Sequence, residues 1–306
     1  MPLITVSYSE LDTGRQCAYK HLLGYKERWT SKETSAALRK GTNWHAIMEV
    51  HYLALKETQE PTKKEQERGK TWAKMSDADR LAHAVKAVEK YINKNLAVFE
   101  EDLDLLTWMY LGYIEHYGID PQWRIVAVEY APELPLPDPS GAPSPFVIKA
   151  KIDLLVRDMD YNRLMIIDHK SGKDLPKEKE LDLDDQFGLY HYLLRELGHN
   201  IFSVIHSAAR TQKNKDQVKN PQPLETRFHR TYMSRIDAEL DTVAAEAFWT
   251  ARDLYARDPE QTPRSTNPDT CRWRCGFTDA CLMARKGVPR HEAMQSFDFV
   301  QDFTRH

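Results

Sequence analysis

Residues 151–173 read KIDLLVRDMDYNRLMIIDHKSGK, two short apolar runs joined by a polar turn. This pattern predicts a β-hairpin. If the turn is centred on the bond that follows Asp160, Asp153 lies as far before that centre as Asp168 lies after it, and the two acids face each other. Their Cβ atoms would then be about 5 Å apart on one face, and Lys170, two residues beyond Asp168, would share that face.

Two carboxylates at that spacing repel each other unless one is protonated or a cation lies between them. Because the strand around Asp168 is otherwise apolar, a hard divalent cation, Mg²⁺ or Mn²⁺, is the natural partner for Asp153 and Asp168. Lys170 would then stabilise the charge that develops on an attacking water or on a phosphate. The alternative is an exposed hairpin in which Asp153 forms an ion pair with Lys151 or Lys170.

The rest of the chain divides into helical and β-rich territory. Apolar residues recur at helical spacing up to about residue 118, whereas short β-rich runs separated by Pro-rich or polar loops follow Pro121. This order predicts an α/β fold with a central sheet flanked by helices. We expect one integrated domain with three parts: a helical region at 1–120, a core sheet at 121–235 and a C-terminal helix and cysteine segment at 236–306. Helices are expected at 7–25, 41–56, 77–92, 101–118, 181–197 and 237–256, and strands at 123–130, 145–156, 163–170, 202–209 and 226–233.

The composition excludes a surface that is strongly charged as a whole. The 306 residues include 43 Lys and Arg against 46 Asp and Glu, so a nucleic-acid or membrane surface would have to be local. The N-terminus lacks the pattern of a secretory signal, and no apolar run approaches the ~18 residues that span a bilayer. We therefore expect a protein of the reducing cytoplasm, where clustered cysteines more often bind a metal than form disulfides.

Three of the four cysteines, Cys271, Cys275 and Cys281, lie within eleven residues, and the fourth is Cys17. Four thiolates fit a tetrahedral zinc site or a 4Fe–4S cluster. Zinc sites usually contain two C-x2-C pairs, which this spacing lacks. A ferredoxin-like redox protein is a further alternative, but the chain has no C-x2-C-x2-C run and a redox function would leave the paired acids unexplained. The remaining alternative is a set of buried cysteines without a ligand.

Further candidate residues stand at helical spacings. His45 follows Gly41 by four residues near the start of a predicted helix, and Gln186 and Tyr190 stand four apart on one face of another. Each alone is more often an ordinary structural or surface residue, although a histidine can supply a nitrogen ligand to a manganese site. Glu129 is one more acid near this region of the sequence, for which a salt bridge is the preferred interpretation over a metal ligand.

In their order along the chain, these motifs resemble the RecB-like branch of the PD-(D/E)XK nucleases. The matching residues are Gly41 and His45 (G-x-x-x-H), Asp153, Asp168 and Lys170 (D-x-K), and Gln186 and Tyr190 (Q-x-x-x-Y). One cysteine near the N-terminus and three near the C-terminus are similar to the iron–sulfur nucleases of that branch: the CRISPR-associated type-four exonucleases, their phage-encoded relatives and the AddB nuclease domain. The resemblance covers residues 7–281, but the proline of the family name is absent before Asp153.

The resemblance implies a restriction-endonuclease-like core with a central mixed β-sheet and a metal site on it. His45, Asp153, Asp168 and the main-chain carbonyl of His169 would bind Mg²⁺ or Mn²⁺. Lys170 would position and activate the attacking water.

The resemblance also assigns roles outside the metal ligands. Gln186 would orient the metal ligands or the scissile phosphate, and Tyr190 would line the DNA track. The four cysteines would bind a 4Fe–4S cluster, with Zn²⁺ as the alternative, and would so join the two ends of the chain.

The implied activity is that of a metal-dependent DNA exonuclease, cytoplasmic and encoded by a bacterium or a phage. It would act on single-stranded DNA or DNA ends in recombination, repair, phage DNA processing or CRISPR adaptation, with a helicase, recombinase or integrase as partner. DNA contacts are expected from two basic stretches at 168–179 and 209–220. The alternative is a non-catalytic iron–sulfur or zinc subunit on the same fold that binds DNA or serves in assembly.

Overall fold

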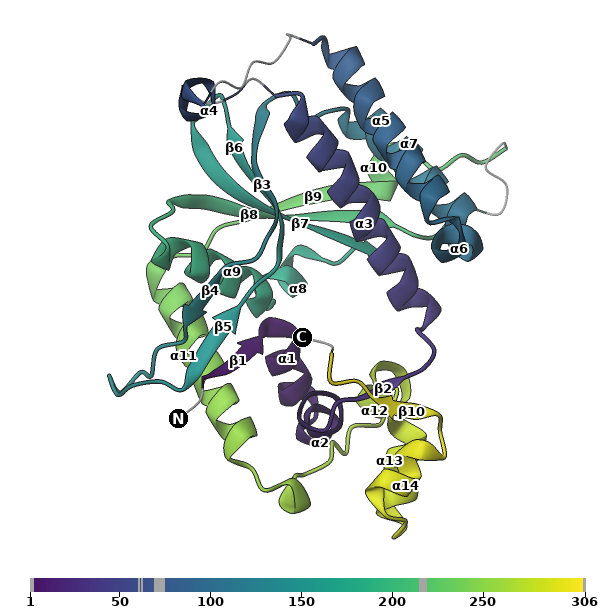
Figure 1. The fold of residues 1–306 in the computed structure, drawn as a ribbon, viewed down its shortest axis with the longest axis vertical. Coiled ribbons are helices and arrows are strands. Elements are labelled where there is room, and N and C mark those ends of the chain that lie inside the picture. The colour runs from purple at the N-terminus through teal and green to yellow at the C-terminus, as the bar shows by residue number, and fades with distance from the viewer. Residues whose placement is uncertain (1–2, 60, 62, 69–74, 215–218, 305–306) are drawn as a thin grey trace. The chain divides into compact units, whose positions relative to one another are not determined.

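The structure is a computed structural model that describes residues 3–59, 61, 63–68, 75–214 and 219–304 (Figure 1). The chain forms two compact units. The sheet unit contains residues 36–132 and 150–240, and the terminal unit contains residues 1–35, 133–149 and 241–306. Within these described residues, none of the helices combines the length and the apolar character needed to cross a membrane.

A five-stranded sheet forms the centre of the sheet unit, in the order β3-β6-β7-β8-β9 (Figure 1). The neighbours β7 and β8 are parallel, and the other neighbouring pairs are antiparallel. The α/β class predicted from the order of the elements is therefore confirmed, and the central sheet is mixed, as the family resemblance implies. The strands are β3 (Trp123–Tyr130), β6 (Ile152–Asp158), β7 (Arg163–Gly172), β8 (Ile201–Arg210) and β9 (Phe228–Met233).

Helices flank this sheet. The long helices α3 (Ala36–Glu57), α5 (Asp77–Lys94) and α7 (Leu103–Tyr117) share one apolar core with the sheet. Within α3, apolar side chains at helical spacing, from Trp44 to Leu55, form the buried face of the helix. A parallel strand pair needs a crossover, and the segment between β7 and β8 supplies it. That segment contains α8 (Glu178–Asp182) and α9 (Asp185–Glu196); the shorter elements are α4 (Lys63–Glu67), α6 (Leu96–Phe99), the 3₁₀ turn η2 (Glu100–Asp102) and α10 (Leu224–Arg227).

The β6–β7 hairpin has the register that the sequence predicts. Leu154 pairs with Ile167, which centres the turn after Asp160. The ladder of paired residues ends at Leu154 and Ile167, and Asp153 and Asp168 are the next residues along the two strands. A shift by one residue would have placed the two acids on opposite faces of the sheet.

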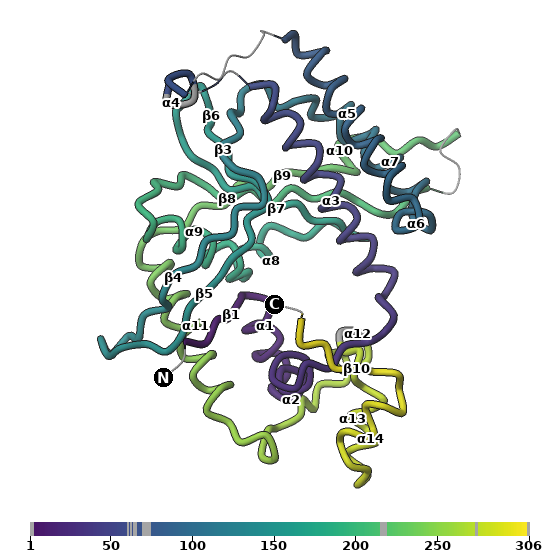
Figure 2. Tube along the Cα trace, in the orientation of Figure 1, coloured from purple at the N-terminus to yellow at the C-terminus, as the bar shows by residue number. Residues whose placement is uncertain are grey.

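The terminal unit gathers segments from both ends of the chain. A small sheet has the order β1-β5-β4, and β2 pairs antiparallel with β10, so the purple and yellow parts of the trace lie side by side in Figure 2. The strands are β1 (Ile4–Ser7), β2 (Trp29–Ser31), β4 (Glu133–Pro135), β5 (Phe146–Lys149) and β10 (Phe299–Gln301). The helices are α1 (Tyr8–Gln16), α2 (Ala18–His21), the π-helical turn η1 (Leu22–Lys26), most of α11 (Asp237–Ala256), the 3₁₀ turn η3 (Pro259–Gln261), α12 (Pro268–Arg274), α13 (Thr278–Arg285) and α14 (Arg290–Gln295).

Three predicted elements differ clearly from the structure. The helix predicted at 181–197 is divided between α8 and α9, because the chain leaves the helical conformation at Asp184, which caps α9. The single strand predicted at 145–156 is wrong, because the chain passes from β5 to β6, in different sheets, at Ala150 and Lys151. Both halves are rich in β-prone residues, so their composition gives no sign of the change of sheet. The predicted helix at 7–25 is interrupted at Cys17, which has extended backbone angles of φ −162° and ψ 109°.

Candidate active site and cysteine hollow

The two acids of the hairpin meet where β6 and β7 cease to pair. Asp153 Oδ2 accepts a hydrogen bond from the main-chain N–H of His169 at 2.7 Å, next to the end of the ladder. Asp168 is buried, with 1% of its surface exposed. The hairpin register therefore brings both predicted acids to one place.

Lys170, Gln186 and Tyr190 form a hydrogen-bonded chain with Asp168. Lys170 Nζ lies 2.9 Å from Asp168 Oδ2 and donates to Gln186 Oε1 at 3.1 Å. Gln186 Nε2 lies 3.2 Å from Asp168 Oδ1 and 2.7 Å from Tyr190 Oη. Asp184 caps α9 by accepting from the main-chain N–H of Gln186, which fixes where this helix begins. One glutamine thus ties α9 to the strand that carries the acid and the lysine.

His45 reaches the same place from α3. Its Nδ1 lies 3.2 Å from Asp153 Oδ2. Gly41, one turn earlier, faces Ser171 of β7, where an added Cβ would be 3.9 Å from the Ser171 Oγ. That distance is an ordinary contact, so space alone does not require the glycine. The structure brings all the predicted side chains of this site together: His45, Asp153, Asp168, Lys170, Gln186 and Tyr190.

The electrostatics of the site separate the two carboxyl groups. Burial raises the pKa of Asp168 to about 6; the charge on Lys170 opposes this rise, and the charge on Asp153 adds to it. Burial also acts to raise the pKa of Asp153, but the hydrogen bond and charge of His45 outweigh it and the pKa is lowered. Burial acts to lower the pKa of Lys170, yet the Asp168 carboxylate raises it on balance. Asp153 and Lys170 are therefore charged at neutral pH, and Asp168 is charged at a cost that a bound cation would reduce.

A buried network lies on the opposite side of β7 from Asp168 and Lys170. The ring of His169 stacks on Tyr52 of α3 at a centroid distance of 5.4 Å, and Tyr52 Oη donates to Asp120 Oδ2 at 2.7 Å. Arg230 of β9 binds both carboxylate oxygens of Asp120, at 2.5 and 2.9 Å, and donates to Tyr113 Oη of α7. The network therefore links α3, α7 and β9 at the residue between Asp168 and Lys170.

Sequence reasoning missed His206, which lies directly beside Asp168. The parallel register of β7 and β8 pairs these two residues, so their side chains share a face. His206 is buried against the edge of Phe187 from α9, and burial lowers its pKa to about 4, so it is neutral in the folded protein. The sequence alone does not identify this neighbour of Asp168, because the pairing depends on the parallel arrangement of β7 and β8 and on their register.

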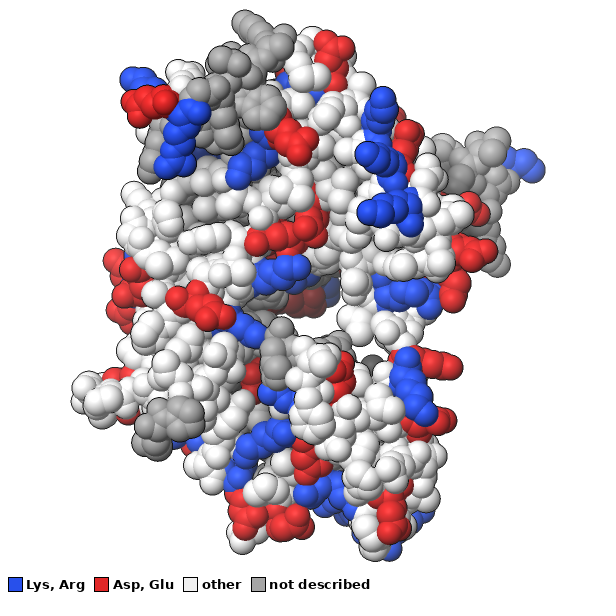
Figure 3. All heavy atoms as spheres, viewed as in Figure 1, with Lys and Arg blue, Asp and Glu red and all other residues white. Residues whose placement is uncertain are grey.

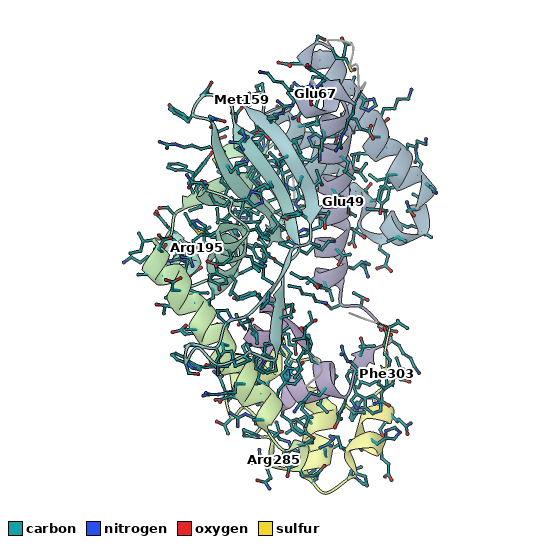
Figure 4. All side chains as sticks on the ribbon, turned by 60° about the vertical axis from the view of Figure 1, so that its left-hand side comes forward. Glu49, Glu67, Met159, Arg195, Arg285 and Phe303 are labelled. Atoms are coloured by element: carbon teal, nitrogen blue, oxygen red, sulfur yellow. The ribbon has the colours of Figure 1, made fainter. Side chains whose placement is uncertain are left out.

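Glu129 occupies an unusual backbone conformation next to the site. It has φ +50°, and it forms an ion pair with Lys151. Burial raises its pKa, with smaller contributions of the same sign from Asp153 and from Glu49 of α3, which is labelled in Figure 4. The salt bridge preferred from the sequence is present, although its partner Lys151 is the residue that we had considered as a partner of Asp153.

The oxygen and nitrogen donors of this site suit a hard divalent cation, but they are not arranged as the ligands of a single ion. Among the described residues, no group of three or more His, Cys, Asp or Glu side chains is arranged to hold a metal ion. Each acid instead lies beside a basic side chain, Asp153 beside His45 and Asp168 beside Lys170. Two carboxylates and an imidazole remain a suitable ligand set for Mg²⁺ or Mn²⁺.

The four cysteines line one hollow in the terminal unit, with a volume of about 290 Å³. Cys17 Sγ accepts hydrogen bonds from the main-chain N–H groups of Lys20 and Ser265, at 3.4 and 3.3 Å. All four are free thiols and half-buried. The structure thus brings Cys17 to the cysteines of α12 and α13, although 254 positions separate it from Cys271.

The sulfur atoms of the hollow are not assembled as a metal site. The described residues include no group of three cysteines placed to hold a metal. Burial raises the pKa of Cys275 and of Cys281, and the nearby Cys17 adds to both shifts. Main-chain N–H groups directed at cysteine sulfur, as at Cys17, are also found around iron–sulfur clusters. Four cysteine sulfurs are suitable ligands for a 4Fe–4S cluster or for Zn²⁺. To bind either one, they would have to move closer together.

The two basic stretches expected to contact DNA meet in the sheet unit. Arg210 lies 3.5 Å from Asp174 and donates to the main-chain oxygen of Lys173 at 3.0 Å. Residues 215–218 of the second stretch lie outside the described residues. On the face drawn in Figure 3, basic and acidic side chains are interspersed, in keeping with the near-neutral total charge.

Comparison with known proteins gives a match for most of the chain. The family model described as the PD-(D/E)XK nuclease superfamily matches residues 5–282. No curated protein matches the chain. A solved structure, described as "Crystal structure of SSO0001", is similar with 14% sequence identity and a TM-score of 0.33, over 63% of this chain and 77% of that chain. A likeness at this level carries no argument beyond the family match.

Proposed function

We propose, given that this chain belongs to the PD-(D/E)XK nuclease superfamily, that it is a metal-dependent DNA exonuclease with its active site in the sheet unit. Nuclease activity is the general property of the superfamily. The observation that carries the proposal is the intact set of an imidazole, two carboxylates and a lysine, in which His45 lies 3.2 Å from Asp153 and Lys170 lies 2.9 Å from Asp168. A degenerate nuclease fold that only binds DNA would not need a buried carboxylate with a raised pKa.

His45, Asp153 and Asp168 would hold a divalent cation, with the main-chain carbonyl of His169 as a further ligand. When bound, this cation supplies Lewis-acid stabilisation of the phosphate and lowers the pKa of a ligand water. Lys170 is protonated in this site and therefore acts as a donor rather than as a base. Two of its three N–H groups are directed to Asp168 and Gln186, which leaves one for the attacking water or the phosphate.

Gln186 keeps the lysine in place during this step. Its amide oxygen accepts from Lys170, while its amide nitrogen lies near Asp168 and Tyr190. Because a charge that develops on the phosphate is best stabilised by donors that are already fixed, this arrangement reduces reorganisation in the transition state.

Incubation of the purified protein with end-labelled single-stranded and double-stranded DNA tests the proposal. We expect degradation from the ends with Mg²⁺ or Mn²⁺ and none with EDTA, while circular DNA stays intact. Lys170→Ala should lower the rate by roughly 10²–10³-fold, the usual cost of removing one donor to transition-state charge. The matched control is Lys86→Ala, an exposed lysine of α5, which should leave the rate unchanged. Metal-independent degradation, or full activity of Lys170→Ala, would overturn the proposal.

The cysteine hollow supports a second part of the proposal, a 4Fe–4S cluster bound by Cys17, Cys271, Cys275 and Cys281. The supporting observation is that all four sulfurs line one hollow and that two main-chain N–H groups already point at Cys17. Anaerobically purified protein should be brown and should lose its colour in Cys17→Ser. Colourless protein with bound zinc would favour the Zn²⁺ alternative instead.

The place of this enzyme in the cell follows from the same proposal. We expect it to act in the cytoplasm on DNA ends during recombination, repair, phage DNA processing or CRISPR adaptation, beside a helicase, recombinase or integrase. The competing function is a non-catalytic DNA-binding or assembly subunit. It would be favoured by DNA binding without degradation under any of the metal conditions above.

A further inference from the structure

An open hollow of about 600 Å³ lies at the turn of the β6–β7 hairpin, which Met159 marks in Figure 4. Two guanidinium groups, an imidazole, two amides and an aromatic ring line it. These belong to Arg157, Arg163, His199, Asn162, Asn200 and Phe202. We call this set, together with the neighbouring Tyr161, the turn patch. It belongs to the sheet unit but contains none of the residues of the candidate active site.

Arg163 lies close to two exposed aromatic rings. Its guanidinium carbon lies 4.0 Å from the ring centroid of Phe202 and 5.6 Å from that of Tyr161. Phe202 is 49% exposed and Tyr161 is 71% exposed. The guanidinium is attracted to these rings, and their exposed surface is available to a further flat group. Unpaired bases supply such a group, because they stack on aromatic side chains.

Arg157 is fixed and its charge is not neutralised within the patch. Its Nη1 donates to the main-chain oxygen and to Oδ1 of Asn162, at 3.2 and 3.1 Å. Neither Arg157 nor Arg163 has a carboxylate within ion-pair distance among the residues that the structure describes. The nearest acid in the turn, Asp158, uses its Oδ1 to accept main-chain hydrogen bonds from residues 160 and 161, and it does not line the hollow.

We infer that the turn patch binds a single strand of nucleic acid, with phosphates at Arg157 and Arg163 and a base on Phe202 or Tyr161. This inference rests on the proposed nuclease function and adds a second contact for its substrate. A duplex keeps its bases stacked inside, so only a single strand can present both its phosphates and a base face to the patch. An acidic peptide would satisfy the arginines but would leave the aromatic rings exposed.

The position of the patch along β7 sets the length of strand that can reach it. Arg163 precedes Asp168 by five residues on the same strand, which corresponds to about 17 Å at ~3.3 Å per residue. A stacked strand advances ~3.4 Å per nucleotide, so at least about five nucleotides are needed to span this distance. The path over the surface is longer, because residues 164–169 are buried. Substrates shorter than this should bind no more tightly because of the patch, whereas longer substrates should bind more tightly.

Binding of a fluorescein-labelled oligothymidylate of twenty nucleotides, measured by anisotropy in EDTA with the full-length Lys170→Ala protein, tests the inference apart from catalysis. Arg163→Ala and Phe202→Ala should each weaken binding by roughly tenfold, in line with the loss of one stacked base. Arg163→Ala should also make binding less dependent on salt concentration. The matched control is Arg252→Ala, an exposed arginine of α11 that lies 6.0 Å from the ring centroid of Phe248. Equal binding by the patch variants and the control would overturn the inference.

The rate of degradation as a function of substrate length separates this inference from the proposed function. In otherwise wild-type protein with Mn²⁺, Arg163→Ala should degrade oligonucleotides of three or four nucleotides at the normal rate and long ones more slowly. If long substrates are degraded normally, the patch is not used and the nuclease function stands. If the wild type degrades nothing while Arg163→Ala still weakens binding, the proposed function fails and the patch stands. Arg163→Lys keeps the positive charge but loses the flat guanidinium, so it should bind with an intermediate affinity. Unchanged melting temperatures should show that all the variants fold.

Discussion

The candidate active site and the cysteine hollow differ in how far the protein alone has built them. In the active site, every predicted side chain has a hydrogen bond or ion pair with another member of the set. In the hollow, Cys17 accepts weak N–H bonds from two main-chain groups, and the four thiols share a cavity. At both sites, the described side chains are not yet arranged around a metal ion. Oxygen and nitrogen groups bind one another strongly enough to be positioned by the fold, whereas thiols bind one another weakly.

The two sites should therefore differ in how strongly their geometry depends on a bound ligand. The active site is held by register, helix caps and buried polar contacts, so its geometry should persist without a metal. The proposed cluster would have to bring the sulfurs together, so its binding should be coupled to the folding of the terminal unit. The predictions below test this division.

The largest effect is expected from the network behind the catalytic strand. Arg230→Met removes the partner of the buried Asp120 carboxylate, and we expect the free energy of unfolding to fall by about 3–5 kcal/mol. Arg230→Met combined with Asp120→Asn removes the orphaned charge and should recover part of this loss. Chemical denaturation of the three proteins measures both values. A loss below about 1 kcal/mol in the single variant would show that the network does not hold the sheet unit together.

Loss of the proposed cluster should come next. Cys281→Ser is expected to lower the melting temperature of the loaded protein by at least about 5 °C and to weaken nuclease activity with it. Wild-type protein freed of its ligand by a chelator is the control, because it should melt at the same temperature as chelator-treated Cys281→Ser. Calorimetry of all four samples gives the comparison. An unchanged melting temperature in loaded Cys281→Ser would contradict the idea that the cluster joins the ends of the chain.

A smaller effect is expected from the residue that ties α9 to the catalytic strand. Gln186→Ala should lower kcat by about 10–100-fold, the usual range for a residue that orients active groups without reacting itself. Tyr190→Phe removes one partner of Gln186 and should cost less than tenfold. Steady-state kinetics on single-stranded DNA separates the two. Equal losses in both variants would mean that Tyr190 acts on the substrate directly rather than through Gln186.

The last effect develops only in acid and concerns the stability of the sheet unit. Burial lowers the pKa of His51, which is hydrogen-bonded to Tyr110, to about 4, below the usual ~6.5 of the unfolded chain. The unfolded state therefore binds the proton more readily, so this stability is present above pH 6.5 and is lost as the pH falls towards 4. The loss amounts to at most about 1.4 kcal/mol per pH unit. His51→Gln should show a shallower decline of melting temperature between pH 6.5 and 4.5 than the wild type, and identical declines would refute this reasoning.

The hairpin register and the grouping of the site could be predicted from the sequence because they depend on local counting. The distance of Asp153 and Asp168 from the turn fixed their meeting, and helical spacing placed Gln186 beside Tyr190. Contacts that depend on the order of strands in the sheet could not be found in this way. His206 joins the site only because β8 lies parallel to β7, and Arg230 reaches Asp120 only because β9 follows at the edge of the sheet.

The division of the chain into two units was also beyond local patterns. The run at 145–156 is uniformly β-prone, yet it serves two sheets. The strands β1, β2, β4 and β10 have three or four residues each, too few for an alternating pattern to stand out. The meeting of Cys17 with the three C-terminal cysteines was expected from the family resemblance, since spacing alone left other arrangements open.

Titration of Mn²⁺ into the protein by calorimetry tests the central claim, that the acids of the β6–β7 hairpin form a cation site independent of the cysteines. Wild-type protein and Cys281→Ser should bind Mn²⁺ with similar affinity at this site. Asp153→Asn should weaken that binding at least tenfold, because it removes a charged ligand while it keeps the shape of the side chain. Unchanged Mn²⁺ affinity in Asp153→Asn, or its loss in Cys281→Ser, would contradict the account.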